Sequence, residues 1–239
     1  MITLYQFTNS HFCEKARWAL DFKGLAYRRK TLVPGPHTAI VKKLAAQSSV
    51  PVIVDGDATI QGSTAIISYL DEKYPESPLT PDDPEQAKQA IEWEQHLDAE
   101  IGVPLRLWFY YHLLPDRRAT TQFLLEGAPW YGHALYAVIF PKLKSTLQKL
   151  MSIDAESARD AERRLEAVWE SLNGRLRERS YLVGDRFSRA DLTACALLYN
   201  FCHPPDIEIP EAVMALRNAR SNDRFYTWVT QTYAGHRAG

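Results

Sequence analysis

The chain has 239 residues, of which 46% are hydrophobic and 24% are charged, and its formal net charge is −1 at pH 7. This composition is typical of a soluble globular protein, and the length allows one large domain or two modest ones. The chain has no excess of basic residues to neutralise phosphates, so we expect no nucleic-acid binding.

The cysteines and the first residues of the chain indicate its cellular compartment, and the histidines indicate whether a metal is expected. Three cysteines, Cys13, Cys195 and Cys202, fit no disulfide framework, which favours a reducing compartment. The first residues include neither a basic segment nor a long apolar run, so we expect no signal peptide and no membrane span. The seven histidines are scattered without the spacing of metal ligands, and no metal is expected. The prediction is a cytoplasmic protein.

The first third of the chain alternates short strands with helices. The expected elements are a strand over 2–7, a helix from 11 to 24, a strand over 26–33, a helical stretch over 38–46, a hairpin over 50–60 and a helix over 63–73. Asn9 and Ser10 offer a cap for the first helix, and Ser63 for the last. This order predicts a small mixed sheet with helices packed on it.

A proline-rich segment separates this part from the rest. Residues 74–84 carry a proline at every third position, which excludes a helix interior or a central strand. We therefore expect a first domain over 1–78, a linker over 79–84 and a second domain over 85–239.

The remainder of the chain has helical patterning. Residues 85–113 and 119–151 are expected to be helical, with a kink at Pro104 and breaks near 127–129 and Pro141.

Two further helices are expected towards the end of the chain. Apolar residues from Ala161 to Leu176 form an amphipathic stripe. Ser188 followed by Asp191 resembles a capping box, and the helix that it opens is apolar all round, so we expect it to be buried.

Segments from both parts of the chain carry a resemblance to a known family. They are residues 10–20 (SHFCEKARWAL), 50–53 (VPVI), 62–70 (GSTAIISYL) and 181–192 (YLVGDRFSRADL). In this order and at these spacings they resemble the cytosolic glutathione transferases. The resemblance implies an α/β thioredoxin-like N-terminal domain, an all-α C-terminal domain and a homodimer. It also implies a detoxification function, with glutathione as co-substrate and an apolar electrophile as acceptor.

Ser10 is the candidate catalytic residue, and Cys13 is its rival. Glutathione reacts as the thiolate, which a hydroxyl donor at a helix N-terminus would stabilise. Taken alone, Ser10 fits a helix cap at least as well, but the resemblance places it where serine-using members hold their activating hydroxyl. Cys13 completes an S-x-x-C pattern that resembles a redox motif, or it is a small packed residue.

The resemblance also implies a glutathione-binding set. Val50 and Pro51 resemble the family's cis-proline turn, whose backbone pairs with the cysteinyl part of glutathione, and Ser63 would hold the γ-glutamyl carboxylate. Gly62 stands where the family has Gln or Glu, so Gln61 or a backbone amide is expected to substitute. The full expected set is Phe12, His37, Val50, Pro51, Gln61, Gly62 and Ser63. The candidate cations for the glycyl carboxylate are His37, Lys42 and Lys43, and a solvated surface position is the alternative for each.

Aromatic residues in the helical part are candidates for the acceptor pocket. We expect His11, Trp108 and Tyr111 to line it, although packing in the core or at a dimer interface is an alternative for each. Three functions remain open at this point: a serine-dependent transferase or peroxidase, a thiol–disulfide reductase that uses Cys13, and a non-catalytic binding protein with the same fold.

Overall fold

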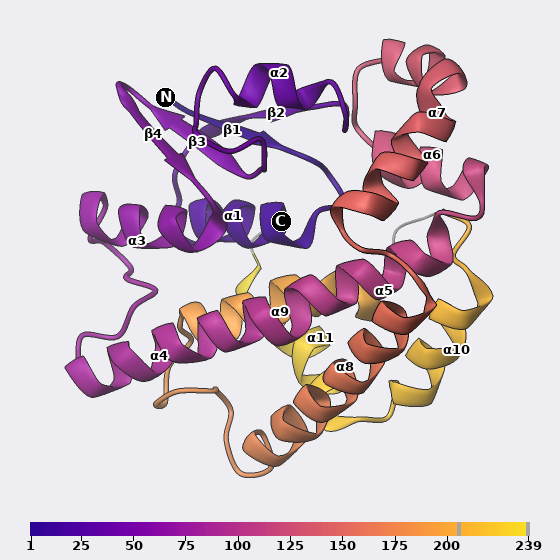
Figure 1. Ribbon diagram of the computed structural model, residues 1–239. Helices are drawn as coiled ribbons and strands as arrows, with labels where there is room; N and C mark the ends of the chain where they lie inside the picture. Colours follow the sequence, from indigo (N-terminus) through magenta and orange to yellow (C-terminus); the bar gives the residue numbers. More distant parts are fainter. Residues whose placement is uncertain (205–206, 238–239) are drawn as a thin grey trace.

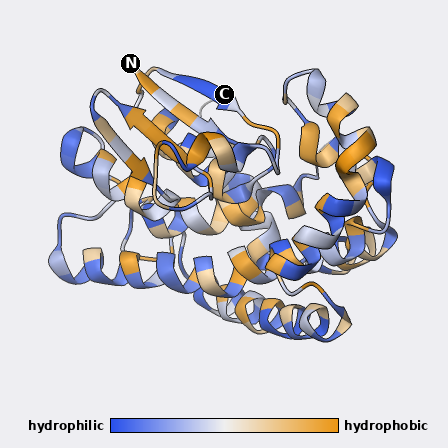
Figure 2. Cartoon of the chain, turned by 45° about the horizontal axis from the view of Figure 1, so that its top comes forward, coloured by the Kyte–Doolittle hydropathy of each residue, from blue (hydrophilic) through white to orange (hydrophobic). Residues whose placement is uncertain are grey.

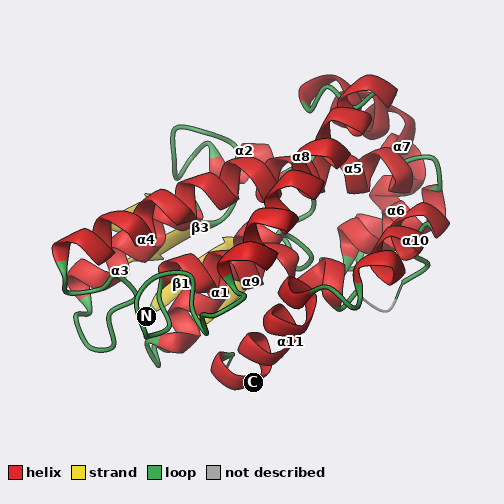
Figure 3. Cartoon of the chain, turned by 90° about the horizontal axis from the view of Figure 1, so that it is seen from below, coloured by secondary structure: helices red, strands yellow, loops and turns green. Residues whose placement is uncertain are grey.

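The computed structural model describes residues 1–204 and 207–237, and Figure 1 shows a part that contains the sheet joined to a helical part. The elements of the first part are β1 (Ile2–Gln6), α1 (His11–Phe22), β2 (Tyr27–Thr31), α2 (His37–Val41), β3 (Val52–Asp55), β4 (Ala58–Gln61) and α3 (Ser63–Lys73). The elements of the second part are α4 (Pro84–Leu97), the π-helical segment η1 (Asp98–Gly102), α5 (Val103–Leu113), α6 (Arg117–Leu125), α7 (Tyr131–Leu150), α8 (Ala155–Arg175), α9 (Arg189–Cys202), α10 (Glu211–Arg220) and α11 (Arg224–His236). Figure 3 shows how far helices outweigh strands.

The four strands form one mixed sheet in the order β2-β1-β3-β4. β1 pairs with β2 in parallel and with β3 in antiparallel fashion, and β3 and β4 form the hairpin. Helices α1 and α3 cover one face of the sheet and α2 lies over the other (Figure 1). This confirms the predicted thioredoxin-like N-terminal domain and helical C-terminal domain.

Two expected helix breaks differ from the structure. The chain stays helical from α4 into α5 through the π-helical segment η1, and Pro104 follows this segment in the first turn of α5. Proline has no N–H to donate, and the preceding π-helical turn, in which the Val103 N–H donates to the Asp98 carbonyl, already departs from the α-helical hydrogen-bond pattern. Pro141 lies inside α7, which continues from Tyr131 to Leu150. The break near 127–129 is present, between α6 and α7.

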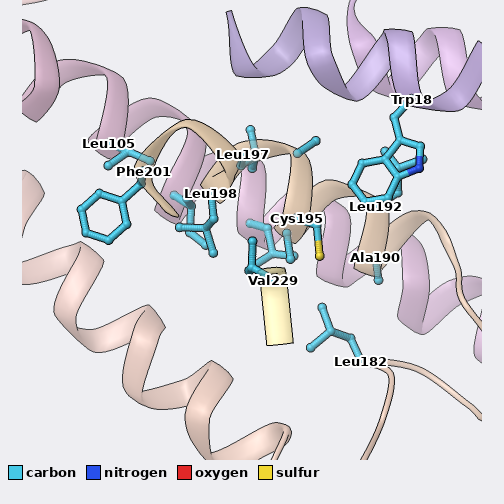
Figure 4. Close-up of a cluster of buried hydrophobic side chains, with 14 of the residues drawn as sticks. Trp18, Leu105, Leu182, Ala190, Leu192, Cys195, Leu197, Leu198, Phe201 and Val229 are labelled. Carbon is cyan, nitrogen blue, oxygen red and sulfur yellow. The ribbon is translucent and has the colours of Figure 1, made fainter. Parts of the chain in front are cut away.

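Helix α9 is the centre of the hydrophobic core. Its capping box is present: the Asp191 carboxylate accepts from the Ser188 N–H at 2.9 Å and from the Leu182 N–H at 2.7 Å. Figure 4 shows Leu197 and Phe201 of this helix among apolar side chains that come from elsewhere in the sequence, including Trp18, Leu105, Leu182 and Val229. Hydrophobic and hydrophilic residues alternate along the other long helices (Figure 2), as expected where one face packs inward.

A buried ion cluster joins the two parts. Lys15 on α1 lies 2.7 Å from Glu94 and 2.8 Å from Asp98, and Glu94 also pairs with Arg189 on α9. The side chains of Lys15 and Glu94 are fully buried, and that of Arg189 is 3% exposed. The sheet-containing part is thereby held against α4 and α9 by charges that water does not screen.

A search of the described helices finds none that is both long enough and apolar enough to cross a bilayer.

Candidate functional site

A cavity of about 280 Å³ lies where the two parts meet. Its walls come from the loop after β1, the first turn of α1, the 34–37 turn, residues 49–50, and helices α5, α6, α7, α9 and α10. Most of this lining is apolar. The arrangement suits a small apolar molecule held beside the start of α1.

Ser10 lines this cavity and caps α1. Strand β1 ends at Gln6 and α1 begins at His11. In the turn between them, the Ser10 N–H donates to the Phe7 carbonyl at 3.3 Å. The Ser10 Oγ accepts from the Cys13 N–H at 3.3 Å. Capping uses a lone pair of the oxygen, so the hydroxyl proton remains available for another acceptor.

Cys13 lies one turn further along α1 and is fully buried. Burial raises the pKa of its thiol above the ordinary value, although Arg17 and Ser10 both oppose this. A thiolate is the reactive form of cysteine, so this environment favours an inert packed residue.

His11 and Phe12 are the first two residues of α1, and both line the cavity as expected. His11 is 9% exposed, and burial together with the charge of Arg106 lowers the pKa of its imidazole to about 3. The ring is therefore neutral at pH 7, and its Nε2 atom is buried without a hydrogen-bond partner in the described part of the chain.

Val50, Pro51 and Ser63 gather at the same end of the sheet as Ser10. The Val50–Pro51 peptide is cis, as the family resemblance implies, and the Pro51 carbonyl accepts from the Gly62 N–H at 2.9 Å. Ser63 is buried at the first position of α3. The expected Ser63 cap is wrong, because Gly62 occupies the cap position with φ at +93°, a left-handed conformation that favours glycine.

Two members of the expected glutathione-binding set are engaged with the protein itself, and Gln61 is the first. The Gln61 amide donates to the carbonyls of Gln47 at 2.9 Å and Ser49 at 2.8 Å, and its oxygen accepts from the Gln47 N–H at 3.2 Å. Gln61 therefore holds the loop that leads into Pro51, and its amide is not free for a ligand.

His37, the second, lines the cavity but is not the expected cation. Its Nδ1 accepts from the Gly35 N–H at 3.0 Å, and the ring also has a backbone hydrogen bond at Ser48. Burial lowers the pKa of the imidazole, so His37 is neutral and links two turns of the wall.

Two residues of α5 were expected to line the acceptor pocket, and they lie on different sides of the helix. Trp108 is buried and lines the cavity, whereas Tyr111 is absent from the lining formed by the described residues and packs edge-on against His112. Tyr111 follows Phe109 by two positions, a rotation of about 200° around the helix axis, so it points away from the side that Phe109 and Leu105 present to the cavity. The expectation for Tyr111 is therefore corrected.

The sequence analysis missed Arg106, which lines the same cavity together with Tyr110. The sequence contained a signal for Arg106, because it is a charged residue inside the apolar run 103–111 (VPLRLWFYY). Its meaning depends on which face of α5 meets the cavity, and the periodicity of so apolar a helix does not decide this.

The family models agree with this architecture. The model for the glutathione S-transferase N-terminal domain matches residues 4–78, and the model for the C-terminal domain matches residues 132–218. Together they span more than half of the chain. The chain belongs to the glutathione transferase superfamily.

Individual relatives match mainly over part of their length. Glutathione S-transferase Z2 of Arabidopsis thaliana is 40% identical over 96 residues, which are 39% of this chain and 42% of that protein. A stringent starvation protein A homolog of Pasteurella multocida is 31% identical over 81 residues, 34% of this chain and 38% of its own. The chain thus aligns with about two fifths of these curated relatives.

The fold likeness extends over the whole chain. A glutathione S-transferase of Ceriporiopsis subvermispora, solved in complex with glutathione, superposes with a TM-score of 0.69 at 18% identity, covering 100% of this chain and 98% of that one. At this identity the likeness concerns the fold alone.

Proposed function

We propose that this protein is a glutathione transferase that joins the sulfur of glutathione to an apolar electrophile. One observation carries the proposal: the Ser10 oxygen uses a lone pair to cap α1, while its hydroxyl proton, beside an apolar cavity, is donated to none of the described residues. A thiolate at this point would accept that proton in a hydrogen bond and would lie in the favourable field of the α1 N-terminus.

The energy required is small. A thiol with a pKa of about 8.5 is only a few per cent ionised at neutral pH, and a tenfold gain in thiolate needs about 1.4 kcal/mol. A hydrogen bond to a charged group contributes about 1.5–3 kcal/mol, so Ser10 suffices. In the reaction a carbon–sulfur bond forms, the leaving group departs with its electron pair, and the thiol proton passes to solvent.

The rest of glutathione would lie along the end of the sheet. The backbone of Val50, next to the start of β3, would pair with the cysteinyl part, and Ser63 at the N-terminus of α3 would receive the γ-glutamyl carboxylate. The same thiolate could instead reduce a peroxide. Turnover measured with an apolar electrophile and with a peroxide distinguishes conjugation from reduction. By family resemblance we also propose a homodimeric, cytoplasmic, detoxifying enzyme.

The test is the Ser10→Ala variant assayed with glutathione and 1-chloro-2,4-dinitrobenzene. We expect turnover to fall at least tenfold while the affinity for glutathione stays similar, because the hydroxyl acts on sulfur and not on the peptide. Ultraviolet difference spectra should show less bound thiolate at pH 7. Unchanged turnover would remove Ser10 from the mechanism.

Two controls separate the chemistry from the cap. Ser10→Ala also removes a helix cap worth about 1 kcal/mol, so unfolding must be measured in parallel. Ser10→Thr keeps both the hydroxyl and the cap and should retain activity. Cys13→Ala should remain active and form no mixed disulfide, whereas an inactive Cys13→Ala that is still folded would favour the reductase alternative.

A second candidate is a non-catalytic binding protein. Gln61 and His37 are hydrogen-bonded to the backbone, so two residues expected to bind glutathione are not available to it. The similarity to a stringent starvation protein A homolog also favours this candidate. Micromolar binding of glutathione in calorimetry would exclude this candidate, and absence of binding at millimolar glutathione would support it.

A further inference from the structure

Among the described residues that line the cavity, one side chain is charged, and no described residue acts as its counter-ion. Of the described residues that form the lining, Arg106 alone is an arginine, lysine, aspartate or glutamate, and both histidines there are neutral at pH 7. Arg106 forms no ion pair within residues 1–204 and 207–237, and its buried Nε atom has no hydrogen-bond partner there. The described lining therefore holds one uncompensated positive charge.

A neighbouring tyrosine adds a hydrogen-bond donor to this charge. Tyr110 lies one turn after Arg106 on α5, and burial raises the pKa of its phenol to about 12, so the hydroxyl remains protonated. The Arg106 guanidinium also lies 5.9 Å from the centre of the Phe12 ring. No described residue of the lining carries a negative charge that could accept hydrogen bonds from these donors.

An uncompensated charge in an apolar wall is unfavourable for the folded protein. Burying an unpaired ion has a large desolvation cost, and surface arginines normally avoid it by staying in water. A guanidinium presents a planar fork of donors that matches a carboxylate. The arrangement is therefore complete only when an anion enters the cavity, where low polarity strengthens the attraction.

We propose that the electrophile of this enzyme is an acid, with an apolar body in the cavity and one carboxylate on Arg106. The inference rests on the proposed transferase function and narrows its acceptor from apolar compounds in general to apolar carboxylates. In that proposal the γ-glutamyl carboxylate of glutathione lies at Ser63 and the cysteinyl part at Val50, both on the sheet side, whereas Arg106 belongs to α5.

A matched pair of aryl chlorides tests this assignment. 4-Chloro-3,5-dinitrobenzoate and its benzamide have nearly the same shape and differ in charge. In both, the glutathione thiolate would form a carbon–sulfur bond while the carbon–chlorine bond breaks and chloride leaves, so the Arg106 interaction can be varied with the reaction unchanged.

Binding is measured first, by calorimetry without glutathione, so that no reaction occurs. We expect the wild-type protein to bind the benzoate about ten- to a hundredfold more tightly than the benzamide, the range expected for a charged hydrogen-bonded pair. Arg106→Met should lose that preference, and Arg106→Lys should keep part of it. Equal binding of the two compounds, a preference that survives in Arg106→Met, or no binding of the benzoate at millimolar concentration would each overturn the proposal.

Stability and thiolate measurements distinguish an acceptor-binding arginine from a structural one and from one that acts on sulfur. Arg106→Met should unfold at the same or a higher denaturant concentration than the wild type, because an unpaired charge is removed, whereas a structural arginine would lower the midpoint. The ultraviolet signal of bound thiolate should stay unchanged in Arg106→Met, and its loss would assign Arg106 to the sulfur of glutathione instead. Turnover with glutathione then tests the transferase function separately, since binding of the benzoate can succeed where catalysis fails.

Discussion

His11 brings a neutral imidazole into the first turn of α1, where the charge of Arg106 acts on it. Burial and this positive charge lower the pKa of His11 from 6.5 to about 3, so the folded protein binds a proton there far less readily than the unfolded chain does. Above pH 6.5, His11 therefore has no effect on the free energy of unfolding. As the pH falls from 6.5 towards 3, His11 lowers that free energy, because the unfolded chain binds a proton that the folded protein does not.

The expected size of this effect can be measured between pH 7 and pH 5. At about 1.36 kcal/mol per unit of pH below the unfolded pKa, His11 should lower the free energy of unfolding by about 2 kcal/mol over this interval. Urea unfolding of His11→Leu should lack this component, whereas His133→Leu, at an exposed position, should follow the wild type. The same acid loss in His11→Leu as in the wild type would contradict the assignment.

The π-helical segment η1 determines how closely α5 approaches α1. At its last residue, Gly102, a Cβ atom would lie 2.5 Å from Cζ of Phe12 and 3.3 Å from Cδ2 of Leu197. The absence of a side chain at this position lets the Phe12 ring lie against the helix, where it forms part of the cavity wall. The shape of the cavity thus depends on an element whose residues never react.

Replacing Gly102 by alanine tests this dependence. We expect Gly102→Ala to be less stable by about 1–3 kcal/mol, because the Phe12 ring must move or the helices must separate. Acceptor affinity should also fall, since the displaced ring narrows the cavity. Gly174→Ala in α8 is the matched control: no atom lies within 4 Å of its added Cβ, and helix propensity predicts a gain of about 0.5–1 kcal/mol. Full stability and unchanged acceptor binding in Gly102→Ala would show that the contact is unimportant.

At the scale of the whole molecule, the two parts are joined through Glu94. Its carboxylate lies between Lys15 of the sheet-containing part and Arg189 of α9, and the Arg189 guanidinium also donates to the Thr64 carbonyl at 3.3 Å and to Ser68 Oγ at 3.1 Å. Removing one member of such a buried cluster leaves the others uncompensated, which costs more than the net contribution of the intact pair. We infer that the two parts unfold together.

Glu94→Gln should lower the free energy of unfolding by about 3–5 kcal/mol. Tryptophan fluorescence and far-ultraviolet circular dichroism should report one coincident transition for the wild type. Glu92→Gln is the control, because its partner Lys88 lies 3.9 Å away on the surface, and we expect a change below about 0.5 kcal/mol. A change equally small in Glu94→Gln would show that the cluster does not join the parts.

The predictable features of this protein were those encoded by neighbours in the chain. The Ser188–Asp191 capping box, the β3–β4 hairpin and the break between α6 and α7 depend on residues a few positions apart, and all are present. The continuity of α7 through Pro141 was not predictable in this way, because packing on both sides of the proline outweighs the lost backbone hydrogen bond.

By itself the sequence determined the order of elements, the two-part architecture and the position of Ser10 at a strand-to-helix junction, because each follows from local periodicity, capping and spacing. Only the tertiary structure decided that Gln61 and His37 bond to the backbone, that Tyr111 faces away from the cavity and that Arg106 lines it with no counter-ion among the described residues. These facts depend on which helix faces meet and which polar groups find partners. Residues distant in the chain settle both, through the packing of the core and the exclusion of water.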